Sequence, residues 1–191
     1  ADKRYRVRCQ LGVRTATGDA EGEMLETRPV VHYSREQLEQ VLNGFRGSIE
    51  QIPPMYSALK HQGQRLYKLA RQGVEVERQP RPVQIHELTL EDQGDDWIDI
   101  SVHCSKGTYI RTLAEDIGEK LGCGAHVSIL RRTAVGPYGE DQLVTLDTLR
   151  ELKEKDMPAM DRLLLPIESA LTQWPDVNLS SDAAFHPAGA A

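Results

Sequence analysis

The hydrophobic pattern changes its period near the middle of the chain. From Trp97 to Cys104 apolar and polar residues alternate, which predicts a strand with one buried face. Beyond a short Lys106-Gly107 turn, apolar residues recur at helical spacing and predict the buried side of a helix: Ile110, Leu113, Ile117 and Leu121. Gly122 then stands where helices commonly end in the left-handed conformation.

The first turn of this predicted helix holds Thr108, Tyr109 and Arg111. It follows the carboxyl end of a strand and offers free helix N–H groups, a common place for ligands. A flat aromatic ring beside a forked cation suits a planar anionic ligand, such as a base with its phosphate. The alternative is a surface tyrosine with a solvated arginine, and the local pattern leaves both open.

A second alternation occupies the beginning of the chain. Apolar residues at every second position from Tyr5 to Val13 alternate mostly with arginines, which predicts a strand with one buried and one cationic face. Residues 16–22 have the composition of a turn, and residues 23–28 are predicted to return as a hairpin partner. Within the turn, Asp19 is expected to cap its own backbone.

Two further patterns predict a helix and a bent strand. Ser34 and Gln37 form a capping box ahead of an apolar helical stripe: Leu38, Val41, Leu42 and Phe45. Between Ile85 and Leu88 the apolar residues change parity, which predicts a strand with a bulge near His86.

The last third of the chain predicts one more strand and two helices. The strand covers residues 127–133, and one helix is expected over residues 159–171. The other is capped by Thr145 and is expected to bury three leucines: Leu146, Leu149 and Leu152. Residues 179–191 lack periodicity and are predicted to be a tail that is disordered or foreign to the protein.

A basic excursion separates the two halves of the predicted sheet. Pro53-Pro54 forces an extended entry, and a short helix is predicted from Arg65 to a stop at Gly73. The excursion also carries Tyr56 and Tyr67, and its cations are expected to bind RNA: Lys60, Arg65, Lys68 and Arg71. The alternative is an ordinary surface hairpin with solvated charges.

The overall composition describes a soluble globular protein. The chain has 191 residues, 39% of them hydrophobic, and no apolar run is long enough to cross a membrane. The net charge of −6 argues against nonspecific coating of nucleic acid, yet basic residues gather in residues 2–14 and 60–82. Two local basic patches on an acidic body favour selective polyanion binding, although solvated faces remain an alternative.

The cysteines and histidines are scattered. Cys9, Cys104 and Cys123 form no close pair, so we expect reduced thiols and a cytoplasmic protein. Cys9 and Cys104 fall on apolar strand faces and are expected to be buried and unbridged. The six histidines form no metal-binding motif, so the sequence predicts no metal site.

Three blocks of the sequence together resemble the bacterial tRNA pseudouridine synthase B family: DKRYRV, QIPPMYSALKHQGQRLYKLARQG and CSKGTYIRTLAEDIGEKLGCGAHVSILRR. The resemblance covers about residues 1–178. It implies an α/β fold of the α+β type, the pseudouridine synthase core, with a mixed and mainly antiparallel sheet flanked by helices. Residues 54–82 would be a thumb-like insertion that grips RNA.

The resemblance also implies an activity and roles for individual residues. The family isomerises a uridine of the tRNA T loop to pseudouridine, so the implied partner is the T stem-loop, bound by a monomer. The implied reaction calls for no cofactor. By position, Tyr5 matches a tyrosine that stacks on the flipped uracil, and Tyr109 and Leu130 match residues lining the uridine pocket. Arg111 matches an arginine that pairs with the nucleophilic aspartate, and Asp19 matches an acidic residue near the pocket.

The sequence also departs from the family pattern. The family's nucleophilic aspartate precedes the DKRYRV block, and a small RNA-binding domain usually follows the catalytic body. We therefore expect a partial catalytic domain that is inactive alone, with Arg111 left without its carboxylate partner.

Two other functions stay open. The basic patches and tyrosines also fit a noncatalytic RNA-binding or RNA-folding module, and a glycine-rich aspartate motif upstream in the reading frame would select the enzyme. A metal- or thiol-dependent hydrolase has only the scattered histidines and cysteines to support it.

Overall fold

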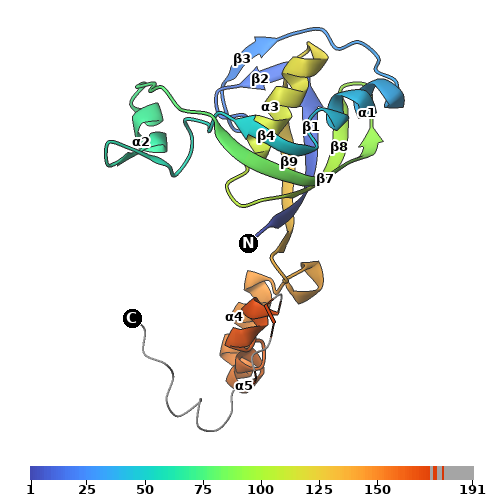
Figure 1. Cartoon of the computed structure of the whole chain (residues 1–191). Coiled ribbons are helices and arrows are strands. Elements are labelled where there is room, and N and C mark those ends of the chain that lie inside the picture. Colours follow the sequence, from blue (N-terminus) through green and yellow to red (C-terminus); the bar gives the residue numbers. More distant parts are fainter. Residues whose placement is uncertain (173, 176–177, 179–191) are drawn as a thin grey trace. The chain divides into compact units, whose positions relative to one another are not determined.

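The computed structural model describes residues 1–172, 174–175 and 178. The chain divides into two compact units, Ala1–Gly136 and Pro137–Ala191 (Figure 1). The first contains the sheet and every residue predicted to act at a site.

A five-stranded antiparallel sheet forms the body of the first unit, in the order β4-β7-β8-β1-β9. The strands are β1 (Lys3–Leu11), β4 (Gly47–Gln51), β7 (Arg81–Gln93), β8 (Trp97–Cys104) and β9 (Ala125–Val135). The predicted fold class is confirmed, and an isolated parallel bridge joins Asp19 to Val127 of β9.

Two helices cover one face of this sheet. α1 (Arg35–Asn43) and α3 (Ile110–Leu121) place their buried leucines in one core with the inward residues of the strands. The predicted alternation of β8 is confirmed, and its inward residues are almost fully buried: Ile98, Ile100, Val102 and Cys104. The capping box of Ser34 and Gln37 and the left-handed end of α3 at Gly122 are also confirmed.

β1 ends at Leu11, two residues before the predicted end of the N-terminal alternation at Val13. Gly12 has a φ of 85°, and its N–H and C=O bond Gly124 and Arg28, so the chain turns out of the sheet there. Val13 therefore starts a separate strand, β2 (Val13–Thr15), which pairs with β3 (Met24–Thr27). The predicted hairpin is confirmed, although its first strand is shorter.

The predicted bulge in β7 is confirmed. The pairing with β8 shifts between Ile85 and Glu87, which leaves His86 as the extra residue. The shift turns His86 and Glu87 outward together while the residues on both sides stay in the core: Val83, Ile85, Leu88 and Leu90.

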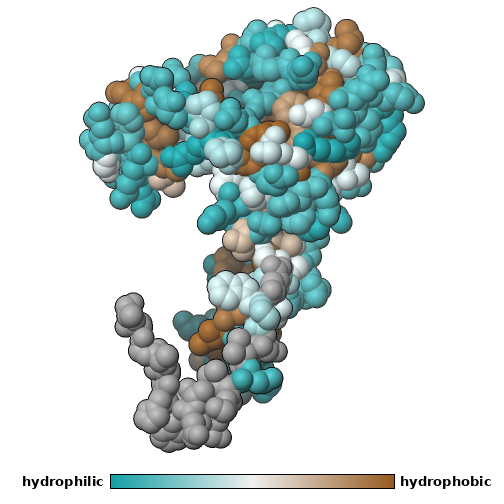
Figure 2. Space-filling view, in the orientation of Figure 1, coloured by the Kyte–Doolittle hydropathy of each residue, from teal (hydrophilic) through white to brown (hydrophobic). Residues whose placement is uncertain are grey.

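The basic excursion leaves the sheet after β4 and returns at β7. It contains a two-stranded ribbon, β5 (Lys60–His61) and β6 (Gln64–Arg65), followed by the short helix α2 (Leu66–Arg71). It projects from the sheet in Figure 1, and Figure 2 shows mostly hydrophilic residues over it. The short helix predicted from Arg65 is confirmed.

The second unit differs more from the prediction. It contains η1 (Glu140–Gln142), α4 (Leu146–Lys155), α5 (Met157–Asp161) and η2 (Ile167–Leu171). Thr145 caps α4 as predicted. The predicted burial of Leu146 is wrong, since its side chain is 70% exposed, and Leu149 and Leu152 are only partly buried.

The single helix predicted over residues 159–171 is also wrong. α5 ends at Asp161, and Pro166 precedes η2, because proline lacks an N–H donor and disfavours helix in the residue before it. The predicted tail at 179–191 lies outside the described residues. Among the described helices, none has the length and apolar character that a membrane crossing needs.

The three cysteines are buried and unbridged, which confirms the prediction for Cys9 and Cys104. Burial raises the pKa of the Cys9 thiol to about 12, so this side chain behaves as a small apolar group.

Gly118 of α3 packs directly against the backbone of Gly124 and Ala125, and Gly118→Ala is expected to destabilise the fold. A Cβ there would lie 2.3 Å from the backbone nitrogen of Ala125 in β9, so helix and strand would have to separate. We expect the free energy of unfolding to fall by about 1–3 kcal/mol, as for other overpacked positions. Urea unfolding would measure it, with the exposed helix-end variant Gly44→Ala as control; equal stability of the two variants would contradict the close packing.

Candidate functional site

Arg111 joins three segments at the start of α3. Its Nη1 donates to the carbonyl of Thr17 at 2.9 Å and to Oδ2 of Asp19 at 3.0 Å. Its Nη2 donates to the carbonyl of Tyr56 at 2.8 Å. The helix, the turn of the β2–β3 hairpin and the entry of the basic excursion therefore meet at one guanidinium.

Asp19 has both a local and a long-range role. Its Oδ1 accepts hydrogen bonds from the hydroxyl of Thr17 and, at 3.3 Å, from the N–H of Glu21, so it caps the turn as predicted. Its Oδ2 forms the ion pair with Arg111. Arg111 thus has one carboxylate partner, because the hairpin turn lies against the helix. The expectation that it lacks the family's nucleophilic aspartate stays a prediction.

Gln51 holds the backbone of Tyr109, a role that the sequence did not predict. Its amide oxygen accepts from the Tyr109 N–H at 3.0 Å, and its amide nitrogen donates to the Tyr109 carbonyl at 3.2 Å. Gln51 is only 2% exposed, and a buried amide needs such partners. The sequence feature that could have indicated this role is a glutamine at the end of a strand, just before the proline-rich entry of the excursion.

Tyr109 itself caps α3 without a side-chain hydrogen bond to the helix. Its backbone is extended, with φ −97° and ψ 109°, so the helix begins at Ile110, later than predicted. Thr108 precedes the helix and donates its hydroxyl to the carbonyl of Ser105.

Tyr5 and Leu130 lie on the neighbouring strands β1 and β9. Tyr5 in β1 pairs with Arg132 in β9, and Val7 pairs with Leu130, so these side chains share one face of the sheet. Tyr5 is 8% exposed, whereas Leu130 is 46% exposed. The guanidinium of Arg132 lies 5.4 Å from the centre of the Tyr5 ring, within cation–π range.

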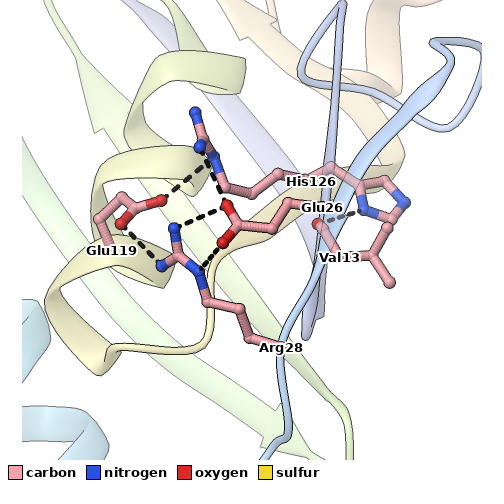
Figure 3. Close-up of polar contacts among 6 residues, drawn as sticks. Val13, Glu26, Arg28, Glu119 and His126 are labelled. Carbon is pink, nitrogen blue, oxygen red and sulfur yellow. Dashed lines mark hydrogen bonds and ion pairs between the residues drawn. The ribbon is translucent and has the colours of Figure 1, made fainter.

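A network of ion pairs fixes the hairpin to the other end of α3 (Figure 3). Arg28 bonds Glu26 at 2.8 Å and Glu119 at 2.9 Å, and Arg14 bridges the same two carboxylates. The hydrogen bond from Arg28 lowers the pKa of Glu26 to about 2, with a further contribution from Arg14. His126 adds a contact to the carbonyl of Val13. The turn that carries Asp19 is thus held from both sides.

The outer side of α3 is acidic. Burial, followed by the charge of Glu119, raises the pKa of Asp116 to about 6, and burial also raises the pKa of Glu115. These groups share a hollow with Glu50, Pro54 and Arg78 at the base of the excursion. Arg14 also lines this hollow, so acidic and basic side chains meet at the base of the excursion.

The four cations predicted to bind RNA all lie on the excursion and are exposed: Lys60, Arg65, Lys68 and Arg71. Lys60 and Arg65 face each other across the β5–β6 ribbon. Arg71 lies over the ring of Tyr67 at 5.7 Å. Within the described part of the chain these cations form no ion pair, so their charges are available to an anion.

Two family models match adjoining parts of the chain. Residues 1–110 match the TruB family pseudouridylate synthase (N terminal domain), and residues 111–172 match the tRNA pseudouridylate synthase B C-terminal domain. The chain belongs to the TruB family of pseudouridylate synthases. The two matches meet at the start of α3, so Arg111 is the first residue of the second match, and the predicted domain of residues 1–178 spans both.

Relatives within the TruB family cover nearly the whole chain. tRNA pseudouridine synthase B of Nitrosococcus oceani is 56% identical over 97% of the chain and 60% of its own length. The synthase of Coxiella burnetii is 54% identical over the same shares, and that of Escherichia coli O1:K1 / APEC is 53% identical over 94% and 59%. The chain therefore spans about 60% of the length of these curated relatives.

Solved structures of related proteins confirm the fold. A Cbf5-Nop10-Gar1 complex matches with a TM-score of 0.65 and 27% identity, over 89% of this chain and 43% of that chain. An H/ACA RNP bound to a substrate RNA containing 2'-deoxyuridine matches with a TM-score of 0.60 and 24% identity, over 89% and 41%. At that identity the second match bears on the fold alone.

Asp116→Asn is expected to stabilise the protein at neutral pH. The carboxyl has an ordinary pKa of 3.8 and a folded-state pKa of about 6, so the folded protein binds the extra proton between these values. The parent protein therefore loses stability as the pH rises from about 4 to about 6, and the asparagine variant does not. Because the side chain is partly exposed, the gain at pH 7 is about 1 kcal/mol.

Urea unfolding at about pH 3.5 and at pH 7 would measure this difference, which should vanish at the lower pH. Asp95→Asn, in an exposed loop, provides the control. A gain of equal size at both pH values would rule out the buried carboxyl as its cause.

Proposed function

We propose that this chain forms part of an enzyme that isomerises uridine to pseudouridine in tRNA, with the T loop as its target. Family membership and the names of the relatives support this activity. The isomerisation breaks the bond from the ribose to N1 of uracil and forms a bond to C5. The proton lost from C5 balances the one gained at N1, so the atoms are conserved and no oxidant or cofactor is required.

The anchored guanidinium of Arg111 is the observation that carries this proposal. Arginine has five N–H donors, and Thr17, Asp19 and Tyr56 use three of them. Among the described residues, the Nε–H and one Nη2–H have no partner. Arg111 is therefore rigidly held and still able to bind a second carboxylate, which is what a nucleophilic aspartate needs to stay ionised and oriented.

A uridine inside a folded loop must leave its stack before it can react, which costs a few kcal/mol. Stacking on an aromatic ring returns about 1–3 kcal/mol. We assign this role to Tyr5, with Tyr109 and Leu130 lining the pocket. Because Arg132 lies over the Tyr5 ring, an incoming base would displace this guanidinium, which could then pair with the phosphate of the flipped nucleotide.

A noncatalytic RNA-binding module is the second candidate, and the unpaired cations of the excursion favour it. It would need the excursion but not the anchored Arg111. The two candidates therefore differ in which variants impair them.

Arg111→Lys is expected to lower kcat for pseudouridine formation by about 100-fold or more, with a smaller change in KM. Lysine keeps the charge but cannot bond Thr17, Asp19, Tyr56 and a second carboxylate at once. A catalytic group misplaced by about 1 Å can lower the rate by about 100-fold. Mass spectrometry of a T stem-loop RNA, with protein made from the complete reading frame, would measure turnover. Arg150→Lys on α4, where the side chain is exposed, serves as control.

The enzyme proposal is supported if the parent protein forms pseudouridine and the Arg111→Lys variant binds RNA as tightly as the parent. Parent protein that binds the RNA but forms no pseudouridine would support the binding module. A variant with full turnover would contradict the role of Arg111.

Neutralising Arg65, Lys68 and Arg71 together is expected to weaken binding of the T stem-loop and to lower its salt slope by up to about 3, near one for each phosphate that the protein no longer neutralises. Filter binding over a salt series would measure the slope. The matched control neutralises Arg150, Lys153 and Lys155 of α4. Arg150 and Lys155 already form ion pairs within this helix, so RNA binding should release few counterions from these side chains, and the salt slope should stay unchanged. A slope unchanged by the first triple would place the phosphate-binding groups elsewhere.

A further inference from the structure

Two histidines that are far apart in sequence come together on the outer face of the sheet. His86 of β7 and His103 of β8 have their ring centres 4.7 Å apart. Asp2 completes the group, with a carboxylate oxygen 3.0 Å from Nε2 of His86. One ligand atom from each of the three residues lies within 4.8 Å of the others.

The bulge in β7 creates this arrangement. In a regular strand, His86 and Glu87 would point to opposite faces, and one of them would enter the core. The register shift instead turns both outward and sets Glu87 opposite His103. Bulges commonly re-aim side chains in this way beside functional sites.

The surrounding contacts support the three residues. The N–H of Gly136 donates to the Asp2 carbonyl at 2.8 Å, which anchors the Asp2 backbone. Arg4 holds the Glu87 carboxylate at 2.6 and 3.1 Å, and this carboxylate lies 3.7 Å from Nδ1 of His103. Nδ1 of His103 is buried and has no hydrogen-bond partner among the described residues. A carboxylate beside a ligating imidazole is a common outer-shell arrangement at metal sites.

We propose that Asp2, His86 and His103 bind a divalent transition-metal ion, with Zn²⁺ as the best fit. Two imidazole nitrogens and one carboxylate oxygen are a recognised ligand set for zinc, and a water would complete a tetrahedron. Calcium and magnesium prefer all-oxygen sites and would bind poorly. The spacing of the histidines in the sequence predicted no metal site, because only the bulge and the pairing of β7 with β8 bring them together.

The ion would have a structural role and would take no part in the proposed isomerisation. By strand register, His103 pairs with Arg4 on the outer face, whereas Tyr5 points into the core face. A bound ion would tie the chain just before β1 to β7 and β8. Since binding requires the folded arrangement, it would raise stability in proportion to occupancy.

Zinc binding can be measured by competition with a chromophoric chelator, and cobalt as a substitute would report the ligands by its visible spectrum. We expect about one ion per chain and, at a hundredfold excess over Kd, a rise in Tm of about 5 °C or more. His86→Gln, His103→Ala and Asp2→Asn should each weaken binding by about 100-fold or more and remove the rise in Tm. His32→Ala, exposed and outside the group, should change neither.

The Tm of each variant is first compared with that of the parent in the presence of a chelator, which keeps the protein free of metal. Because Asp2 is exposed, Asp2→Asn should have nearly the same Tm as the parent under these conditions. A cobalt spectrum without thiolate charge-transfer bands would support histidine and carboxylate ligands and exclude the cysteines. No zinc binding by the parent, or binding that none of the three variants weakens, would overturn the proposal. Unchanged pseudouridine formation in the same variants would separate this site from the proposed enzyme activity.

Discussion

The close contact between α3 and β9 fixes the position of the helix whose first turn carries Arg111. Gly118 lets the helix approach the strand so closely that no side chain fits between them. With the helix axis fixed in this way, its first turn meets Gln51 from β4 and the hairpin turn that contains Asp19. The polar contacts of Arg111 are therefore a consequence of apolar packing further along the same helix.

The hairpin and the helix stabilise each other through charges at both ends of α3. Arg111 joins them at the helix start, and Arg14, Glu26, Arg28 and Glu119 join them at its end. Most of these side chains are partly exposed, so a single pair contributes little, whereas a network with shared partners restrains geometry more than it adds stability. In the proposed enzyme, such restraint would help to hold Arg111 where it orients the nucleophile.

The sequence predicted the features that depend on neighbouring residues. The alternation in β8, the capping box at Ser34 and the parity change at His86 are local patterns, and the structure confirms all three. The features it missed depend on distant partners. Gly12 leaves the strand because Gly124 and Arg28 take its backbone groups, and Arg111 meets Asp19 across 92 residues. The second unit shows a different limit, because Leu146 lies at helical spacing yet is largely exposed. Periodicity indicates which face of a helix is apolar, and the burial of that face depends on what packs against it.

The two ends of the basic excursion are neighbours in the sheet, because Gln51 at the end of β4 pairs with Arg81 at the start of β7. The sheet itself therefore closes the loop, and the free energy of closure varies only with the logarithm of loop length. Insertions and deletions in the basic excursion should therefore leave the sheet nearly undisturbed. The length of this excursion is thus free to change without strain on the sheet, because the pairing of Gln51 with Arg81 fixes both of its ends.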